Sequence, residues 1–251
     1  MAAKQTPENE FQSQASAFPV LADDLTELPA IPGGWKTVEY EFGKKSLSIY
    51  CPADPDLFLD DNDVMAANEK NDYMPFWTFL WPSAIQMASL MDQAPWESGS
   101  SVLELGSGLG LVGLAALKRG DEVTFSDYDP TALHVCRMSS IKNGLPDPSV
   151  LQLDWRQPID EQYDAIIGCE VTYDAPMHTV ILDLCDKMLK PEGVCWFGDP
   201  GRYLSPDFYR LALSRTYQVR ILNKELNEIE IPSSEGFQIF ELRRTCISSN
   251  I

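Results

Sequence analysis

The chain has 251 residues, 44% hydrophobic and 23% charged, a balance typical of one globular domain with an extension. Its net charge of −19, with no cluster of Lys or Arg, argues against a nucleic-acid partner and favours a partner with a basic or neutral surface. No stretch reaches the roughly 18 apolar residues of a membrane helix, and the N-terminal residues lack the apolar core of a signal peptide. We therefore expect a cytoplasmic protein without a membrane partner, and favour a monomer.

The cysteines and histidines predict no metal centre. Six cysteines are scattered without CxxC spacing, mostly in apolar runs, which indicates buried free thiols. The two histidines, His134 and His178, fall on separate predicted helices, where we expect them to be at the surface or partly packed. They offer too little material for a histidine-based metal site.

The N-terminal third predicts an arm followed by a small β extension. Residues 1–34 are rich in Glu, Gln, Ser, Pro and Ala, a composition typical of a flexible arm. Residues 35–251 form one domain, in which 35–72 are a hairpin-and-loop extension and 73–251 the core. Segments 37–42 and 47–50 flank Gly43, as in a β-hairpin. The acidic stretch 54–63 reads equally as a solvated loop or as a lid.

The remaining residues alternate between predicted strands and helices. An aromatic run at 73–82 opens the first helix, at 83–91. Strands are expected at 102–105, 122–126, 150–153, 165–169, 194–198, 217–222 and 237–242, and further helices at 111–119, 131–143, 177–189 and 206–214. This alternation predicts an α/β fold with a doubly wound, mostly parallel, seven-stranded sheet. The last two strands have no helix between them, so they must pair antiparallel.

The first predicted strand ends in three alternate glycines, Gly106, Gly108 and Gly110. Glycines at a strand-to-helix turn let a nucleotide-like cofactor approach the backbone. The run reads as G-x-G-x-x-G, a dinucleotide fingerprint that continues to Gly113, or as E-x-G-x-G-x-G beginning at Glu104. The spacing alone does not choose between these readings.

Acidic residues end the following strands, where an open α/β sheet binds its ligand. Asp127 lies about twenty residues after the glycine loop, where a carboxylate can accept both ribose hydroxyls, and Asp129 is better placed to cap the next helix. Asp154 is positioned to accept a hydrogen bond from an adenine amino group. Tyr128 and Trp155 follow these two acids.

Together these residues resemble a known family. The motif Glu104-Leu-Gly-Ser-Gly-Leu-Gly110, the upstream pair Trp81-Pro82, the pair Asp154-Trp155 and the segment from Tyr163 to Tyr173 are similar to class I S-adenosylmethionine-dependent methyltransferases of the family-16 lysine methyltransferase group. The resemblance covers roughly 76–202. Segment 199–202 (Asp-Pro-Gly-Arg) resembles the electron-transfer-flavoprotein β-subunit lysine methyltransferase branch.

The resemblance implies a Rossmann-like methyltransferase that transfers a methyl group to a protein lysine. In this group a D-x-x-Y motif borders the methyl-transfer site. Here the motif is E-x-x-Y, so Glu170 and Tyr173 are the expected catalytic residues. The expected cofactor is S-adenosylmethionine, and the residues expected to bind it are Trp81, Glu104, Gly106, Ser107, Gly108, Gly110, Asp127, Tyr128, Asp154 and Trp155. Arg202 is expected to contact a carboxylate, either of the substrate or within the protein.

Two alternatives remain open at this point. A methyltransferase of the same fold that acts on a small molecule has the same donor site. An NAD-dependent oxidoreductase is compatible with the Gly106-x-Gly108 spacing and Asp127. Against the oxidoreductase are Glu104, the antiparallel final strands and the lack of a Ser/Tyr/Lys or His-based hydride-transfer group.

Overall fold

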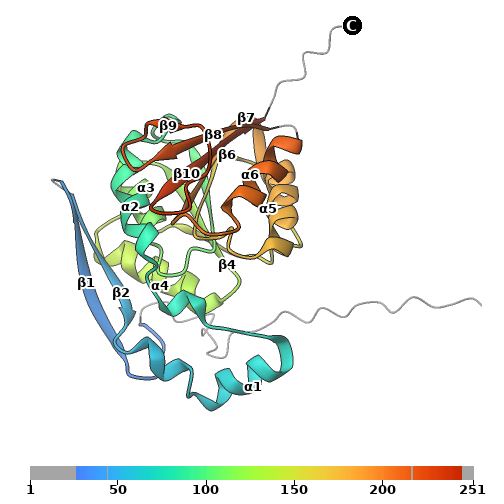
Figure 1. Ribbon diagram of the computed structural model, residues 1–251. Helices are drawn as coiled ribbons and strands as arrows, with labels where there is room; N and C mark the ends of the chain where they lie inside the picture. The colour runs from blue at the N-terminus through green and yellow to red at the C-terminus, as the bar shows by residue number, and fades with distance from the viewer. Residues whose placement is uncertain (1–26, 44, 216, 245–251) are drawn as a thin grey trace, which may run out of the picture.

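The computed structural model describes residues 27–43, 45–215 and 217–244 (Figure 1). Most of the predicted arm lies outside these residues. Its last part, residues 27–34, packs against the domain: Leu28 and Ile31 contact the hydrophobic core, and the backbone oxygen of Glu27 lies 2.7 Å from Nε2 of His134.

The predicted hairpin is present as a separate two-stranded sheet. Strands β1 (Trp35–Phe42) and β2 (Lys45–Pro52) pair antiparallel along their full length. Leu47 and Ile49 of β2 face inward and are buried. The hairpin therefore packs on the domain through β2.

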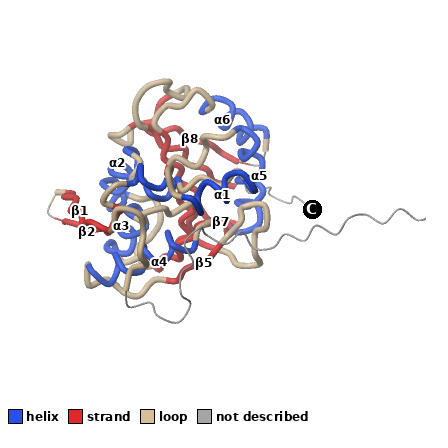
Figure 2. The backbone as a smooth tube through the Cα atoms, turned by 90° about the horizontal axis from the view of Figure 1, so that it is seen from below, coloured by secondary structure: helices blue, strands red, loops and turns tan. Residues whose placement is uncertain are grey.

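The acidic stretch 54–63, read from the sequence as a loop or a lid, contains a 3₁₀ turn and the first two residues of a helix. A 3₁₀ turn at Pro55–Phe58 precedes helix α1 (Asn62–Asn71). The carboxylate of Asp61 begins α1 by accepting hydrogen bonds from the backbone N–H groups of Asp63 and Val64. In Figure 1 α1 lies below the sheet, and Figure 2, viewed from below, shows it in front of the strands.

The central sheet confirms the predicted alternation and adds one short strand. Its order is β5-β4-β3-β6-β7-β10-β8-β9. The parallel strands are β5 (Ser149–Gln152), β4 (Glu122–Asp127), β3 (Ser101–Leu105), β6 (Tyr163–Cys169) and β7 (Leu189–Asp199). Strand β10 (Gln238–Arg244) pairs antiparallel with both β7 and β8 (Tyr217–Asn223), and the two-residue β9 (Glu228–Ile229) is the eighth strand.

Helices cover both faces of this sheet. On one face lie a 3₁₀ turn η2 (Phe76–Thr78) and helices α2 (Pro82–Leu90), α3 (Leu111–Arg119) and α4 (Pro130–Lys142). On the other lie α5 (Ala175–Met188) and α6 (Ser205–Ser214). Strand β3 shows why the sheet is doubly covered, because Val102 belongs to one buried cluster while Leu103 and Leu105 belong to the other.

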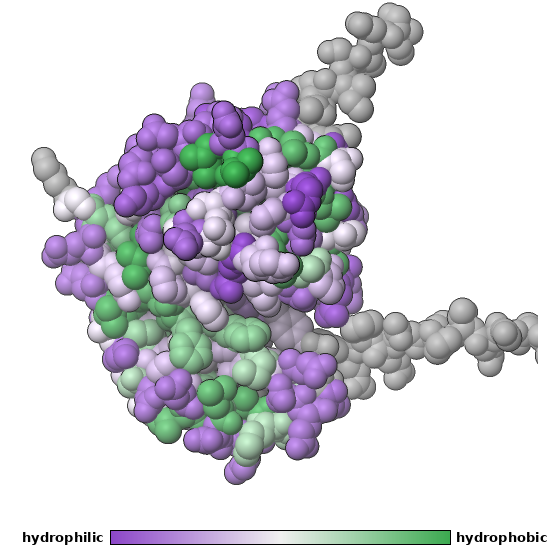
Figure 3. Space-filling view, viewed as in Figure 1, coloured by the Kyte–Doolittle hydropathy of each residue, from purple (hydrophilic) through white to green (hydrophobic). Residues whose placement is uncertain are grey.

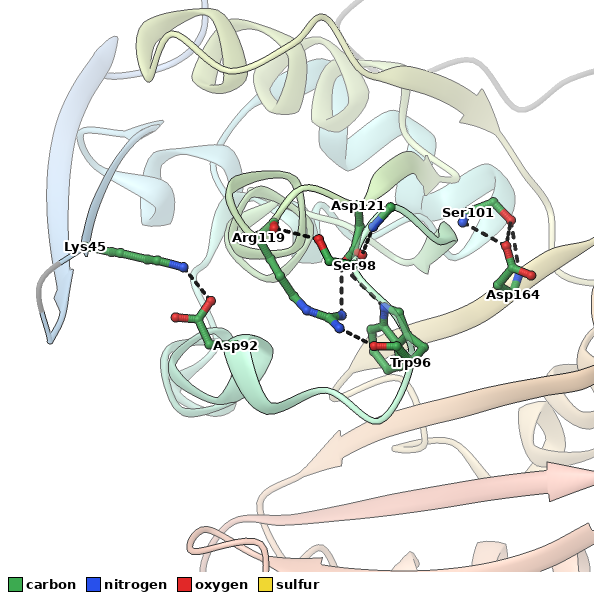
Figure 4. A network of polar contacts seen from close by, with 9 residues as sticks. Lys45, Asp92, Trp96, Ser98, Ser101, Arg119, Asp121 and Asp164 are labelled. Carbon is green, nitrogen blue, oxygen red and sulfur yellow. Dashed lines mark hydrogen bonds and ion pairs between the residues drawn. The ribbon is translucent and has the colours of Figure 1, made fainter.

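The starting edge of the sheet is held by a polar network (Figure 4). Asp121, just before β4, accepts hydrogen bonds from Arg119 at 3.1 Å and from the Trp96 ring nitrogen at 3.3 Å. Ser98 donates to the backbone oxygen of Arg119 at 2.9 Å. These contacts anchor the end of α3, whose beginning carries the glycine loop at the opposite edge.

Both histidines are buried, more fully than the expected surface or partly packed positions. His134 is packed under residues 27–34, and Nε2 of His178 lies 2.8 Å from the backbone oxygen of Thr172. Five of the six cysteines lie in the described residues, and these five are free thiols. Among the described residues no group of His, Cys, Asp and Glu is arranged to hold a metal ion.

Candidate active site

A cavity of about 620 Å³ lies at the carboxyl edge of the parallel strands, a volume typical of small-ligand sites. Among the residues that line it are Trp81, Glu104, Gly106, Ser107, Gly108, Asp127, Tyr128, Asp154, Trp155, Glu170 and Tyr173. Eleven of the twelve predicted site residues therefore meet in one place. Ten of them lie at the ends of neighbouring parallel strands, and Trp81 comes from the position before α2. The exception is Gly110.

Each of the three loop glycines is in the left-handed region, at φ of 58°, 52° and 76°. At Gly108, which lines the cavity, an added Cβ would lie 3.8 Å from the backbone of Trp77, an ordinary van der Waals contact. At Gly110, which begins α3, an added Cβ would lie 2.6 Å from the sulfur of Cys136. Gly108 therefore gives access to a ligand, whereas Gly110 allows α3 and α4 to pack closely.

Glu104 is a buried carboxylate beneath this loop. One oxygen, Oε1, accepts a hydrogen bond from the N–H of Gly113 in the first turn of α3 at 3.0 Å, and the other, Oε2, has no partner. Burial raises the pKa of Glu104 to about 8. A buried carboxylate oxygen without a partner costs free energy, so the site favours a ligand that brings a positive charge or a donor to it.

Asp127 and Asp129 end β4 in different environments. Asp127 accepts hydrogen bonds from the N–H groups of Gly108 and Asp129, both at 2.9 Å, and burial raises its pKa to about 6. Asp129 caps α4 as predicted, accepting from the N–H of Thr131 at 2.7 Å. Its other oxygen accepts from the hydroxyl of Tyr73 at 2.5 Å.

Tyr73 is a site residue that the sequence reasoning did not assign. The Trp77 ring nitrogen lies 3.4 Å from the Tyr73 hydroxyl, and both side chains are buried. Together they tie the segment after α1 to the end of β4. The aromatic run at 73–82 was the available signal, but hydrophobic core packing predicts the same pattern.

Two side chains that were predicted to contact the donor, Asp154 and Ser107, form hydrogen bonds within the protein. Both oxygens of Asp154 accept from the guanidinium of Arg156, at 2.8 and 2.9 Å, and these bonds outweigh partial burial and lower the pKa of Asp154. The hydroxyl of Ser107 donates to the backbone oxygen of Ser126 at 3.1 Å, which joins the glycine loop to β4. The hydroxyl of Tyr128 is buried without a hydrogen-bond partner.

Glu170, after β6, is held from two sides. Its Oε1 accepts the N–H of Ser83 at the start of α2, at 3.1 Å, and its Oε2 lies 2.5 Å from the guanidinium of Arg202, after β7. Arg202 therefore contacts an internal carboxylate, one of the two possibilities left open above. The guanidinium carbon also lies 5.9 Å from the centre of the Trp81 ring.

The mouth of the cavity beyond Glu170 is aromatic. Phe76, Trp81 and Tyr173 are 47%, 38% and 45% exposed, and the ring of Phe76 lies 6.4 Å from that of Trp81 and 6.1 Å from that of Tyr173. Trp77, from the same run, is instead buried in the core. The cavity thus leads from a buried acidic floor to an exposed aromatic rim.

Solved structures with the same architecture show the fold. One is a ribosomal protein L11 methylase from Lactobacillus delbrueckii subsp. bulgaricus, at a TM-score of 0.55 and 17% identity, with 70% of this chain and 92% of that chain covered. This similarity supports the predicted Rossmann-like fold.

Sequence comparison finds similar methyltransferases of several kinds. The chain is 31% identical over 135 residues to a ubiquinone biosynthesis O-methyltransferase from Xylella fastidiosa, covering 51% of this chain and 52% of that protein. It is 32% identical over 102 residues to a protein N-lysine methyltransferase, METTL21A, from Xenopus tropicalis, covering 38% and 46%. The chain spans about half the length of the curated relatives that it matches.

A family profile described as lysine methyltransferase matches residues 60–204, from the beginning of α1 through the loop that carries Arg202. The match covers more than half of the chain and includes all twelve predicted site residues. As the resemblance predicted, the chain belongs to the lysine methyltransferase family.

Proposed function

We propose that this protein is an S-adenosylmethionine-dependent methyltransferase that methylates a lysine side chain of a protein. The observation that carries the donor assignment is the unpartnered Oε2 of Glu104 in a cavity rich in buried acids. The two arginines of the cavity lining, Arg156 and Arg202, are each paired with a carboxylate. S-adenosylmethionine brings a sulfonium and an ammonium, whereas the pyrophosphate of NAD would bring two further negative charges.

The residues of the cavity fit this donor in distinct ways. Glu104 would accept from the ammonium, Asp127 from the ribose hydroxyls and Asp154 from the adenine amino group. Gly106 and Gly108 would let the donor lie against the backbone. Five further residues would shape this site: Trp81, Ser107, Tyr128 and Trp155 would line it, and Gly110 would support the loop. When bound, the donor supplies an electrophilic methyl group on its sulfonium.

The acceptor would enter past the aromatic rim. A lysine of ordinary pKa near 10.4 must lose its proton before it can attack, and desolvation between Phe76, Trp81 and Tyr173 favours the neutral amine. Glu170 would orient the amine, and Arg202 limits the counter-effect of its charge by partly neutralising that carboxylate. We assign the chemistry to positioning and the exclusion of water rather than to a general base.

We also propose where in the cell the enzyme acts and in which oligomeric state. None of the helices in the described ranges is long and apolar enough to cross a membrane. The five free cysteines suit a reducing compartment, which supports a cytoplasmic location. We propose that the enzyme acts there as a monomer.

Donor choice is tested by thermal stability with S-adenosylmethionine, S-adenosylhomocysteine and NAD in parallel. A ligand that binds only the folded state raises stability by RT ln(1 + [L]/Kd), or about 2.7 kcal/mol at 100 times Kd. We expect stabilisation by the first two ligands. Stabilisation by NAD alone would refute the proposal in favour of an oxidoreductase.

Acceptor class is tested with a cell extract and donor labelled in its methyl group. We expect the label in protein, released as methylated lysine on acid hydrolysis and lost when the extract is treated with protease beforehand. Label only in small molecules would reject the protein-lysine assignment and support the small-molecule alternative.

A further inference from the structure

A second, apolar groove of about 380 Å³ adjoins the mouth of the candidate site. It is lined by Leu59, Met74, Pro75, Phe76, Phe79, Leu80, Trp81 and Pro82. Five of these residues, from Met74 to Trp81, also line the main cavity, so the groove and the cavity are continuous. Anything held in the groove therefore lies next to the aromatic rim.

Exposed apolar side chains are concentrated in the segment of the chain that forms this groove. Of the thirteen large hydrophobic side chains that are exposed in the described residues, seven lie between positions 57 and 85. Leu57, Leu59 and Met65 are 42%, 46% and 45% exposed. In Figure 3 green side chains lie among purple ones over α1, in the lower part of the view. An exposed apolar patch rimmed by polar residues is typical of an interaction site.

The same segment is strongly acidic. Between residues 54 and 72 there are seven carboxylates and one lysine: Asp54, Asp56, Asp60, Asp61, Asp63, Glu69, Asp72 and Lys70. In the part of the chain that the structure describes, none of these seven acids forms a salt bridge. Asp72 and Asp174 extend this negative charge to the lining of the main cavity. The groove is thus an apolar slot within an acidic surface.

We propose that this surface, residues 54–82, docks a basic segment of the protein substrate, with a bulky apolar residue of that segment in the groove. The docking surface rests on the proposed function and specifies its partner. Phe76 and Trp81 belong to both the groove and the rim, and Phe76 contacts Tyr173 at 6.1 Å between rings. An anchor in the groove would therefore present a nearby lysine to Glu170.

The negative charge of the docking surface favours a different protein as its partner over a second copy of the chain or residues 1–26. A second copy would bring another net charge of −19 to an acidic surface. Residues 1–26 contain four acids and one lysine, so they also carry negative charge. A segment rich in Lys or Arg complements the surface, and such complementarity gives specificity as well as faster association.

The direct test is fluorescence anisotropy with three labelled peptides of fifteen residues. One contains several lysines and two leucines, the second replaces the leucines by serine, and the third replaces the lysines by glutamate. With S-adenosylhomocysteine present, we expect the first peptide to bind at least tenfold more tightly than the other two. Equal binding of all three would overturn the proposal.

Matched variants locate the binding. Leu59→Gln combined with Met65→Gln should weaken the lysine–leucine peptide about tenfold. Leu213→Gln on α6, which is as exposed as Leu59 at 46%, should leave binding unchanged. Asp60→Asn combined with Asp63→Asn should weaken binding at low salt, with the difference fading as salt screens the charges. Unchanged binding in both double variants would place the peptide elsewhere.

Two further measurements separate this proposal from the proposed function and from self-association. In the labelled extract, the Leu59/Met65 variant should methylate protein less than the Leu213 variant does, with equal affinity for S-adenosylhomocysteine. Equal labelling by the two variants would reject the docking surface alone, whereas no labelling by any form, with donor binding intact, would reject the methyltransferase assignment. A wild-type dimer in sedimentation that the Leu59/Met65 variant abolishes would assign the groove to a second copy.

Discussion

Arg202 holds Glu170 across the candidate site, with its guanidinium 2.5 Å from Oε2 of a carboxylate whose side chain is only 4% exposed. The N–H of Ser83 occupies the other oxygen. Glu170 itself has a φ of 57°, a conformation that non-glycine residues seldom adopt. Three elements, the loops after β6 and β7 and the start of α2, thus meet at one side chain.

Replacing Arg202 by methionine should leave a buried charge without its partner. We expect Arg202→Met to destabilise the fold by about 1–3 kcal/mol, below the range for fully buried pairs because the arginine side chain is 34% exposed. Urea unfolding measures this change. Adding Glu170→Gln to Arg202→Met should recover most of the loss; if the double variant is less stable than Arg202→Met, the pair does not act as described.

Glu170→Ala should lower turnover with little effect on the donor. Glu170 pairs with Arg202, whose guanidinium lies over the Trp81 ring of the rim, whereas the proposed ribose contact is Asp127. We therefore expect at least a tenfold fall in kcat and less than a twofold change in the Kd of S-adenosylhomocysteine. Single-turnover kinetics and calorimetry give the two numbers. A large loss of donor affinity with normal kcat would reverse the assignment.

Asp127→Ala should produce the opposite pattern. Losing the carboxylate removes the proposed ribose contact, so donor affinity should fall about tenfold or more, corresponding to about 1.4 kcal/mol or more. In the wild type, burial raises the pKa of Asp127 to about 6, so donor affinity should also fall as the pH drops below 6 and this carboxylate is protonated. Calorimetric titration between pH 5 and pH 8 checks both effects; a wild-type affinity independent of pH would contradict the ribose role.

Glu104→Gln should raise the stability of the protein at high pH and weaken donor binding. Because burial raises the pKa of Glu104 from 4.5 to about 8, the folded state binds this proton more tightly than the unfolded chain does. Without donor, the free energy of unfolding of the wild type should therefore decline as the pH rises from 4.5 to about 8. At pH 9 we expect Glu104→Gln to be more stable than the wild type by up to about 5 kcal/mol, because each pKa unit of this shift corresponds to about 1.4 kcal/mol, with little difference at pH 4.5.

The same variant should bind S-adenosylhomocysteine at least tenfold more weakly, since the neutral amide cannot pair with the ammonium. Melting curves at the two pH values and calorimetry at pH 8 test these statements together. If Glu104→Gln loses stability at pH 9 and keeps its donor affinity, Oε2 is not the ammonium contact.

Gly108→Ala and Gly110→Ala should differ although the two glycines share a loop. At Gly110 the added methyl group collides with Cys136, so we expect a loss of about 2–4 kcal/mol of stability. At Gly108 the added methyl group would meet only the Trp77 backbone at 3.8 Å, so backbone strain costs about 1–2 kcal/mol. Because Gly108 lines the cavity, the change should weaken donor binding more than tenfold. Urea unfolding measures the stability of the two variants, and calorimetry measures their donor affinity. Equal losses of stability in both variants would contradict the packing role of Gly110.

The parallel strands and the helix cap at Asp129 could be predicted, because the residues at their ends and the topology of the sheet point to the same arrangement. The strands from β3 to β7 are apolar runs that end in acids or glycines, and parallel strands bring those ends to one edge whatever the details of packing. The cap at Asp129 follows from its position one residue before Pro130. Ten of the eleven predicted site residues in the cavity reach it for this reason, and Trp81 reaches it from the segment before α2.

Other features depend on contacts that no local pattern encodes. Helix α1 has few buried side chains, Val64 being one, so its sequence shows no apolar stripe and reads as a loop. The Arg202–Glu170 pair joins residues 32 positions apart, and its partners meet only because β6 and β7 are neighbours. The burial of His134 depends on residues 27–34 packing over it.

The place of β10 in the sheet has a consequence for the order of assembly during synthesis. This strand is the last described element of the chain, yet it lies between β7 and β8 rather than at an edge. A growing chain that ends before residue 238 can form the donor side of the sheet but has nothing to join β8 to β7. The sheet therefore closes only after the residues of β10 have left the ribosome, and a chain interrupted before them would expose two unpaired strand edges to aggregation.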